Sequence, residues 1–287
     1  MRSTEVMFSL ITNKAKADDR IRAVLLNGSR ANPDAKTDRF QDFDIVYIVT
    51  EIKSFVADHS WIDIFGDRII LQMPDAMIIG NEEEKHKEKN SFGYLMLFKD
   101  GNRIDLTLFP IDKLQNERKA DSLTKVLLDK DGLFIHIHEP GIKDYLIKRP
   151  AQKEFTDCCN EFWWVSTYVA KGLRRNEITY AKEMLEVYVR AMFMKMIEWY
   201  IGFEKEFSVP FGKAGRHMKD HISPALYKKI LSTYPGAEEE SIWTSLFTMI
   251  ATFKELAAAI IARSNYKYNH EEEENVLIYL KKMKELH

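Results

Sequence analysis

Two aspartates, Asp42 and Asp44, are separated by one residue in a segment that otherwise has the apolar alternation of a buried strand. Side chains alternate across a β-strand, so residues i and i+2 face the same side with Cα atoms roughly 6 to 7 Å apart. Both carboxylates are therefore predicted to point into one space, where two unpaired anions would be unfavourable. A divalent cation would remove that penalty, because Mg²⁺ prefers oxygen ligands and typically uses one or two carboxylates.

A glycine and a serine, Gly28 and Ser29, stand a short way upstream, directly after an apolar run that reads as a strand. They offer backbone N–H groups and a hydroxyl to a phosphate. A third carboxylate, Asp105, interrupts another run with strand alternation, at residues 102–109. An isolated Asp-x-Asp pair is most often a surface pair at a strand edge. The apolar flanks, the Gly-Ser pair and the later aspartate instead favour a metal-dependent nucleotidyl transfer site.

Each residue of this predicted site has a role that its chemistry suits. Asp42 and Asp44 are predicted to hold Mg²⁺ while a triphosphate lies on the Gly-Ser turn. Asp105 has two open roles: ligand to a metal ion, or general base that takes the proton from an attacking hydroxyl. We favour the base with a share in metal binding. Arg30 could neutralise charge on phosphate oxygens; the alternative is an exposed arginine in a loop.

The elements that position these residues fall into two halves. Apolar alternation predicts strands in the first half, with an Asp-Gly turn between the last two long ones that is typical of a hairpin. These strands are expected at residues 21–26, 42–49, 68–73, 92–98 and 103–109, with a further short element at 123–128 and a helix at 3–15. Apolar residues at helical spacing dominate the second half. These helices are expected at residues 153–172, 179–200, 224–231, 238–262 and 271–285.

The predicted fold class is therefore α+β/α. Residues 1–149 are expected to form a mixed β-sheet domain with flanking helices, and residues 150–287 an all-α helical bundle. A chain of 287 residues, of which 45% are hydrophobic, is long enough for two such domains with their own cores.

Composition argues against several classes of protein. Lys and Arg number 42 against 44 Asp and Glu, so the basic footprint of a nucleic-acid-binding protein is missing and no nucleic acid partner is expected. The two cysteines are adjacent in sequence and cannot form a disulfide bond that links distant parts of the fold, which fits a reducing compartment. No apolar stretch is expected to span a bilayer, 256–262 being too short, and no secretion signal is evident. We expect a cytoplasmic protein without membrane partners, a monomer or weak dimer.

Two segments carry a more specific resemblance. Asn27-Gly28-Ser29-Arg30 with the residues to Pro33, and the segment 41–47 around Asp42 and Asp44, resemble the streptomycin-type aminoglycoside 6-adenylyltransferases of the polymerase-β-like nucleotidyltransferase superfamily. Segments 162–164, 168–173 and 177–182 resemble the helical half of the same family. The resemblance implies a nucleotidyltransferase domain that transfers AMP from Mg-ATP to the 6-hydroxyl of streptomycin, which confers antibiotic resistance. Spacing and composition alone reach only nucleotidyl transfer to some hydroxyl.

A stripe on the first helix of the second half suits such an acceptor. Streptomycin carries two guanidinium groups, which carboxylates bind by paired hydrogen bonds and aromatic rings by stacking. Asp157, Glu161, Trp164 and Tyr168 lie at i, i+4, i+7 and i+11, along one side of a helix. The alternative places the two aromatic residues in the bundle core and the acids in solvent. Lys171, one turn further on, could bind the triphosphate or be an ordinary exposed lysine.

Other functions are compatible with the same carboxylates. An enzyme that adenylylates a protein, as in toxin–antitoxin modules, is the main alternative. A nucleotide-binding regulator without transfer activity is a second, although a binder needs no general base. An RNA-extending transferase is disfavoured by the charge balance.

Overall fold

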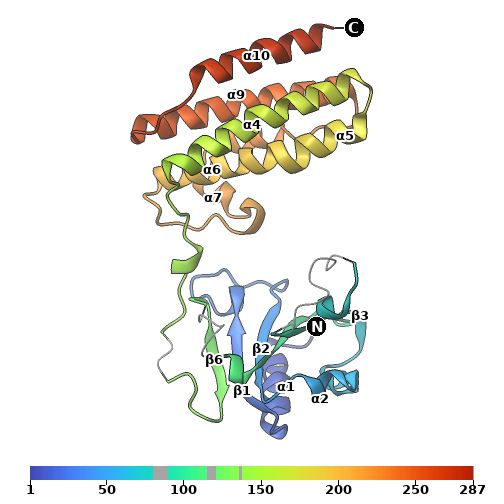
Figure 1. Ribbon diagram of the computed structural model, residues 1–287. Helices are drawn as coiled ribbons and strands as arrows, with labels where there is room; N and C mark the ends of the chain where they lie inside the picture. Colours follow the sequence, from blue (N-terminus) through green and yellow to red (C-terminus); the bar gives the residue numbers. More distant parts are fainter. Residues whose placement is uncertain (80–89, 115–120, 136–137, 287) are drawn as a thin grey trace. The chain divides into compact units, whose positions relative to one another are not determined.

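The computed structural model describes residues 1–79, 90–114, 121–135 and 138–286. The chain divides into two compact units, Met1–Asp144 and Tyr145–His287. Figure 1 shows strands in the first unit and helices in the second. A mixed sheet with flanking helices and a helical C-terminal region were predicted, and both are confirmed.

The first unit is built on a six-stranded sheet with the strand order β3-β4-β5-β2-β1-β6. Neighbouring strands are antiparallel except for β2 and β5, which are parallel. The strands are β1 (Ile21–Asn27), β2 (Phe43–Val49), β3 (Arg68–Gln72), β4 (Phe92–Phe98), β5 (Arg103–Pro110) and β6 (Lys125–Asp129). The helices are α1 (Thr4–Ala17) and α2 (Lys53–Val56), with short 3-10 helices at Gly28–Arg30, His59–Phe65, Pro74–Ala76, Ile111–Lys113 and Lys143–Tyr145.

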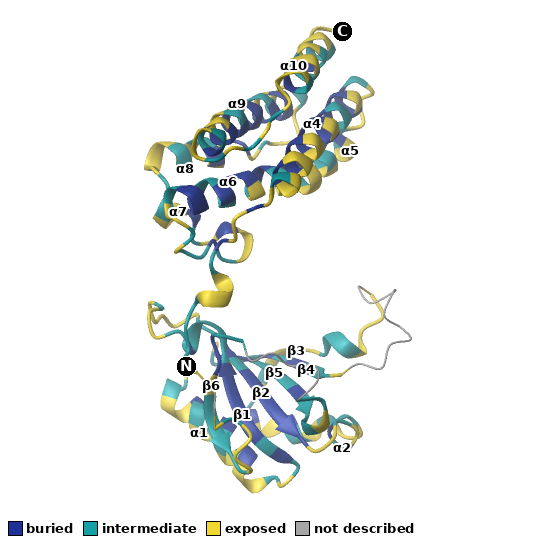
Figure 2. Cartoon of the chain, turned by 60° about the vertical axis from the view of Figure 1, so that its left-hand side comes forward, coloured by how far each residue is buried: buried dark blue, intermediate teal, exposed yellow. Residues whose placement is uncertain are grey.

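The two faces of the sheet are packed differently. One face carries the larger apolar cluster, into which α1 inserts Met7 and Ile11, and the hydroxyl of Tyr47 donates to the Ile11 carbonyl at 2.7 Å. The other face carries a small cluster that includes Val46 and Ile48. Figure 2 shows the buried central strands. Side chains alternate along a strand, so the even-numbered residues of β2, such as Val46, face the side of the sheet that carries the smaller apolar cluster.

The hairpin predicted between β4 and β5 is confirmed. Its turn contains Gly101 at φ +84°, a conformation that glycine adopts without strain. Arg2 braces the turn, since its Nε and its backbone N–H donate to Asp100 Oδ2 at 2.7 and 3.0 Å. The N-terminal segment therefore holds the start of β5 in place.

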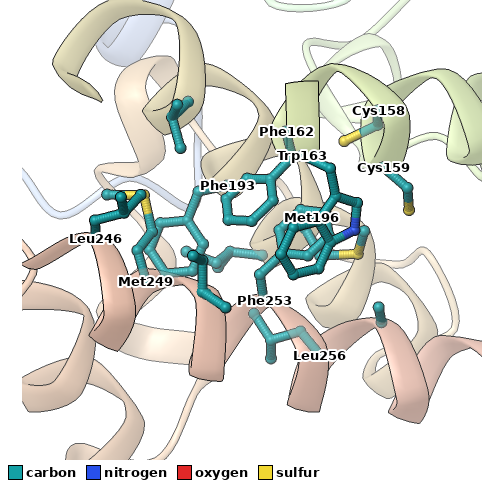
Figure 3. Packing of buried hydrophobic residues seen from close by; sticks show 14 of the residues in the cluster. Cys158, Cys159, Phe162, Trp163, Phe193, Met196, Leu246, Met249, Phe253 and Leu256 are labelled. Atoms are coloured by element: carbon teal, nitrogen blue, oxygen red, sulfur yellow. The ribbon is translucent and has the colours of Figure 1, made fainter. Parts of the chain in front are cut away.

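Helices make up the second unit. The helices are α4 (Gln152–Arg174), α5 (Ile178–Glu183), α6 (Arg190–Glu204), α7 (Met218–His221), α8 (Pro224–Leu231), α9 (Glu239–Arg263) and α10 (His270–Glu285). The single helix expected at 179–200 is α5 and α6 joined by a π-helical turn at Met184–Val189, and a 3-10 helix lies at Lys213–Gly215. Figure 3 shows the core, where Phe162 of α4 stacks on Phe253 of α9 with ring centroids 3.8 Å apart. Cys158 and Cys159 are free and buried in this core.

The expectation that no apolar stretch approaches membrane-spanning length needs correction. Helix α9 is long and apolar enough by length and composition, the one such helix among the described residues. Half of its most apolar stretch is buried. Trp243, Leu246 and Phe253 of α9 belong to the hydrophobic core of the second unit. The apolar composition of α9 is therefore explained by helix packing.

Candidate active site

The predicted carboxylates meet on one face of the sheet. β2 and β5 are parallel and in register, and Asp44 is the direct partner of Asp105. Asp42 lies two residues earlier, just before β2, and its Oδ2 is 3.7 Å from Nη1 of Arg103, which also pairs with Asp105. Residues of the same parity further along β2 belong to the small apolar cluster, so the acids lie on the less covered side. The pairing of two strands that are distant in sequence thus brings all three acids to one place.

The Gly-Ser turn lies directly beside this row. Asn27 at the end of β1 pairs with Asp44 across the antiparallel strands, and Gly28 then turns the chain at φ +69°. A Cβ atom built on Gly28 would lie 2.2 Å from Asp44 Oδ2, so a side chain there would displace the carboxylate. Thr124 fixes the neighbouring residue, because its hydroxyl donates to Asn27 Oδ1 at 2.9 Å. The backbone at Gly28 is therefore held close to the Asp44 carboxylate.

An arginine stands among these acids. Arg103 donates from Nε to Asp105 Oδ1 and from Nη2 to Asp105 Oδ2, both at 2.7 Å, and its Nη1 is 3.7 Å from Asp42 Oδ2. No role for Arg103 was predicted from the sequence. The signal was present, because the alternation that joins Asp42 to Asp44 also places Arg103 on the same side of β5 as Asp105.

Burial and charge shift the titration of this cluster. Partial burial raises the pKa of Asp42, an effect that the Arg103 guanidinium opposes and the Asp105 carboxylate reinforces. The hydrogen bond to Asp105 raises the pKa of Arg103, so this guanidinium stays charged. The charged form of Asp42 is therefore disfavoured, an effect that Arg103 and Arg30 only partly offset.

The side chain of Arg30 contacts the backbone of the segment that leads into β2. Its Nε donates to the Asp42 carbonyl at 3.0 Å and its Nη2 to the Gln41 carbonyl at 2.8 Å. The guanidinium also stacks on the Phe43 ring, 3.9 Å from the ring centroid. Arg30 thus braces the backbone that carries Asp42, a contact between residues that are not neighbours in sequence.

The acceptor stripe predicted on α4 lies in the second unit. Trp164 is 58% exposed, so the alternative that places it in the bundle core is wrong, whereas Tyr168 is partly buried and packs against that core. The Trp164 indole N–H donates to the Tyr168 hydroxyl at 2.7 Å, and Lys171 Nζ lies 5.7 Å from the centroid of the Tyr168 ring. Glu161 is exposed, and exposed Asp157 accepts from Lys153 at 2.5 Å. These residues form a surface of acids and aromatic rings that we call the α4 face.

Comparison with known proteins identifies the family. Residues 1–283 match the family model described as streptomycin adenylyltransferase. The chain belongs to that family. It is therefore an enzyme, an adenylyltransferase, as the resemblance of segments 27–33 and 41–47 implied.

Relatives of this adenylyltransferase match over nearly the whole length. A Bacillus subtilis (strain 168) protein named aminoglycoside 6-adenylyltransferase is 42% identical over 269 residues, 93% of each chain. Proteins of the same name are 40% identical in Campylobacter jejuni, covering 93% of this chain and 91% of that one, and 32% identical in Staphylococcus aureus, covering 93% and 94%. A crystal structure of an aminoglycoside 6-adenyltransferase from Bacillus subtilis shares 37% identity over 100% of both chains, with a TM-score of 0.49.

Adenylyltransferases typically use a divalent cation, and the residues present here fit one. The donor set of Asp42, Asp44 and Asp105 consists of carboxylate oxygens, which Mg²⁺ prefers. The absence of a side chain at Gly28 lets the Asp44 carboxylate lie against the Gly28 backbone, where a Cβ atom would meet Oδ2 at 2.2 Å. In the parts of the chain that the structure describes, no three acidic, histidine or cysteine side chains are positioned to hold a metal as they stand. At this site the Arg103 guanidinium lies against two of the three acids.

Proposed function

We propose that this adenylyltransferase transfers AMP from Mg-ATP to the 6-hydroxyl of streptomycin and releases pyrophosphate, which would confer resistance to the antibiotic. The observation that carries the proposal is the in-register pairing of Asp44 with Asp105, beside Asp42 and the Gly28 turn. The names of relatives that are 32% to 42% identical over about the same length support the acceptor class.

The first unit suits the nucleotide. We assign residues 1–149 as the nucleotidyltransferase domain, in which Gly28 and Ser29 receive the triphosphate through backbone N–H groups and a hydroxyl. Asp42, Asp44 and Asp105 would hold magnesium, which supplies charge neutralisation on the phosphate oxygens. Arg30 stays a candidate for phosphate contact, in addition to its bonds to the 41–42 backbone.

The chemical step needs one base. Asp105 accepts the proton from the acceptor hydroxyl, whose oxygen then attacks the α-phosphorus of ATP. A new bond forms between that oxygen and the α-phosphorus, while the bond from the α-phosphorus to the bridging oxygen breaks. Pyrophosphate leaves with the electron pair. Asp105 would also help to hold the metal, in addition to its role as the base that activates the acceptor hydroxyl.

The α4 face suits the acceptor. We assign residues 150–287 as the acceptor-binding domain, with Asp157 and Glu161 bound to guanidinium groups of streptomycin. Trp164 offers an exposed aromatic ring, and Tyr168 a partly buried one, on which a guanidinium stacks. Lys171, at the end of the same face, is proposed to contact phosphate oxygens.

Mass spectrometry tests the proposal directly. Streptomycin incubated with the protein, ATP and Mg²⁺ is expected to gain the mass of one AMP, and NMR of the product is expected to place it on the 6-hydroxyl. A parallel incubation with labelled ATP and cell lysate tests protein acceptors. Label on protein and none on the drug would overturn the proposal in favour of a protein-adenylylating enzyme, and no pyrophosphate release with any acceptor would favour a nucleotide-binding regulator.

A further inference from the structure

Arg103 is a resident cation among the proposed metal ligands. Nε and Nη2 of Arg103 donate to the two carboxylate oxygens of Asp105, both at 2.7 Å. Nη1 of Arg103 lies 3.7 Å from Asp42 Oδ2. Bidentate arginine–carboxylate pairs are among the stronger hydrogen-bonded contacts in proteins. Two cations that share the same carboxylates repel each other. A metal ion bound to Asp42 and Asp105 therefore has to displace Arg103 at least in part.

The side chain of Arg103 is placed so that it can move. It is 42% exposed and lies at the start of β5, directly after the hairpin turn. Arg30, by contrast, is fixed by two backbone carbonyls and by stacking on Phe43. The ion-pair partners of Arg103 are Asp42 and Asp105, which are also proposed metal ligands. Withdrawal of Arg103 therefore breaks the ion pairs of a half-exposed side chain rather than the packing of a buried one.

We propose that Arg103 is an exchangeable counter-cation. It neutralises Asp42 and Asp105 before the metal binds, and it then transfers its guanidinium fork to phosphate oxygens of the nucleotide. The fork geometry matches phosphate as well as carboxylate. Residue 103 also faces the same side of β5 as Asp105, which keeps its side chain within reach of a phosphate held there. This inference rests on the proposed function, because it takes the three aspartates as the metal site.

Two binding measurements with opposite expected signs test the exchange. In Arg103→Gln, Mn²⁺ without nucleotide is expected to bind roughly 3- to 10-fold more tightly by calorimetry, because a competing cation is gone. The non-transferable analogue α,β-methylene-ATP with Mg²⁺ is expected to bind roughly 3- to 10-fold more weakly, because a phosphate contact is lost. A purely structural arginine would weaken both. A variant that binds Mn²⁺ no more tightly, or the analogue no more weakly, overturns the proposal.

Matched variants isolate the cause. Arg103→Met, of similar length and without charge, is a second neutral variant with the same expected signs, and circular dichroism verifies that each variant is folded. Arg22→Gln is the control, because Arg22 holds Asp131 in a similar fork and is expected to leave both affinities unchanged. Arg103→Lys retains the charge and is expected to bind Mn²⁺ as the wild type does; tightening as large as in the glutamine variant overturns the proposal.

One further variant separates this inference from the proposed function. Asp44→Asn is expected to abolish Mn²⁺ binding in the wild-type and Arg103→Gln backgrounds alike. Unchanged binding in Asp44→Asn would place the metal elsewhere and overturn the proposed site itself. Wild-type binding that depends on Asp44 but does not respond to Arg103 overturns only the exchange.

Discussion

Gly28 lies so close to Asp44 that a side chain at position 28 would force the carboxylate to move. A Cβ atom on Gly28 would lie 2.2 Å from Asp44 Oδ2, and the residue has φ +69°. Two requirements therefore coincide at one position: a left-handed backbone and an absent side chain. The first is a matter of stability, whereas the second affects the orientation of a proposed metal ligand.

Gly28→Ala is expected to lower turnover by about 100-fold or more, because a displacement of about 1 Å in a reacting group is enough for such a loss. Gly132→Ala is the matched control. Gly132 has φ +68°, but its Cβ would meet Ile135 Cδ1 at 3.3 Å and no acid. Both variants are expected to lose about 1 to 2 kcal/mol of stability from backbone strain, and only Gly28→Ala to lose activity. Equal activities of the two variants would contradict the assignment.

Asp42 gives the site a pH dependence. Burial raises its pKa in the folded state above that of the unfolded chain, so the folded state binds the proton more tightly. The stability contributed by Asp42 is therefore greatest below the unfolded pKa of about 3.9 and decreases as pH rises through the folded pKa. At neutral pH without metal, Asp42→Asn is expected to raise the melting temperature by about 1 to 3 °C, since it removes a disfavoured charge.

The melting curves that check this prediction run from pH 3 to pH 8 with a chelator present. The advantage of Asp42→Asn is expected to vanish at the acidic end, and Mg²⁺ is expected to stabilise the wild type more than the variant. Asp34→Asn, an exposed residue of the same loop region, is the control and should match the wild type throughout. A variant less stable than the wild type at pH 7 would show that the Asp42 charge is favourable in the fold.

Much of the site could be predicted because strand alternation is a local property. It placed Asp42 beside Asp44 and put Asp105 on a hairpin strand. The parallel pairing of β2 with β5, which makes Asp44 and Asp105 direct partners, joins strands far apart in sequence and has no local signature. Arg103 follows the same alternation along β5, but a prediction that rests on carboxylates alone leaves this arginine out.

In the helical half, too, some features could be predicted from the sequence and others could not. Apolar spacing predicted helices near their observed positions, because 3.6-residue periodicity is also local. The π-helical turn at Met184–Val189 does not alter that periodicity enough to be read from sequence. The exposure of Trp164 depends on which helices pack against α4. Sequence therefore left open whether this tryptophan belonged to the core or to a binding surface.

Asp105 can be tested as a base and as a ligand in one variant. Asp105→Asn retains the shape and a carbonyl oxygen but accepts no proton, so turnover is expected to fall by about 10² to 10⁴-fold. Affinity for Mg²⁺ with α,β-methylene-ATP is expected to change much less, because Asp42 and Asp44 remain. Single-turnover kinetics with streptomycin separates the two effects. Asp112→Asn, on the 3-10 helix after β5, is the control. Turnover of Asp105→Asn within a few-fold of wild type would remove the base assignment.

Trp164 tests the α4 face as the acceptor surface. Trp164→Ala is expected to raise the KM for streptomycin by about 3- to 30-fold, the range of a guanidinium stacked on an indole ring. Its kcat and its KM for ATP are expected to change little, because the contact is made equally in the ground state and the transition state. Steady-state pyrophosphate release, with each substrate varied in turn, measures all three constants. Since the indole is 58% exposed, the melting temperature should stay near that of the wild type.

Ile278→Ala supplies the control for Trp164→Ala, because Ile278 is a comparably exposed apolar side chain, 66% accessible, on α10 rather than α4. Its kinetic constants should equal those of the wild type. Tyr168→Phe refines the test: it removes the hydroxyl that accepts the Trp164 indole N–H and keeps the ring. If the hydrogen bond orients the indole, this variant has an intermediate KM for streptomycin. A KM for streptomycin that is unchanged in Trp164→Ala would move the acceptor site off the α4 face, while leaving the carboxylate row and its chemistry untouched.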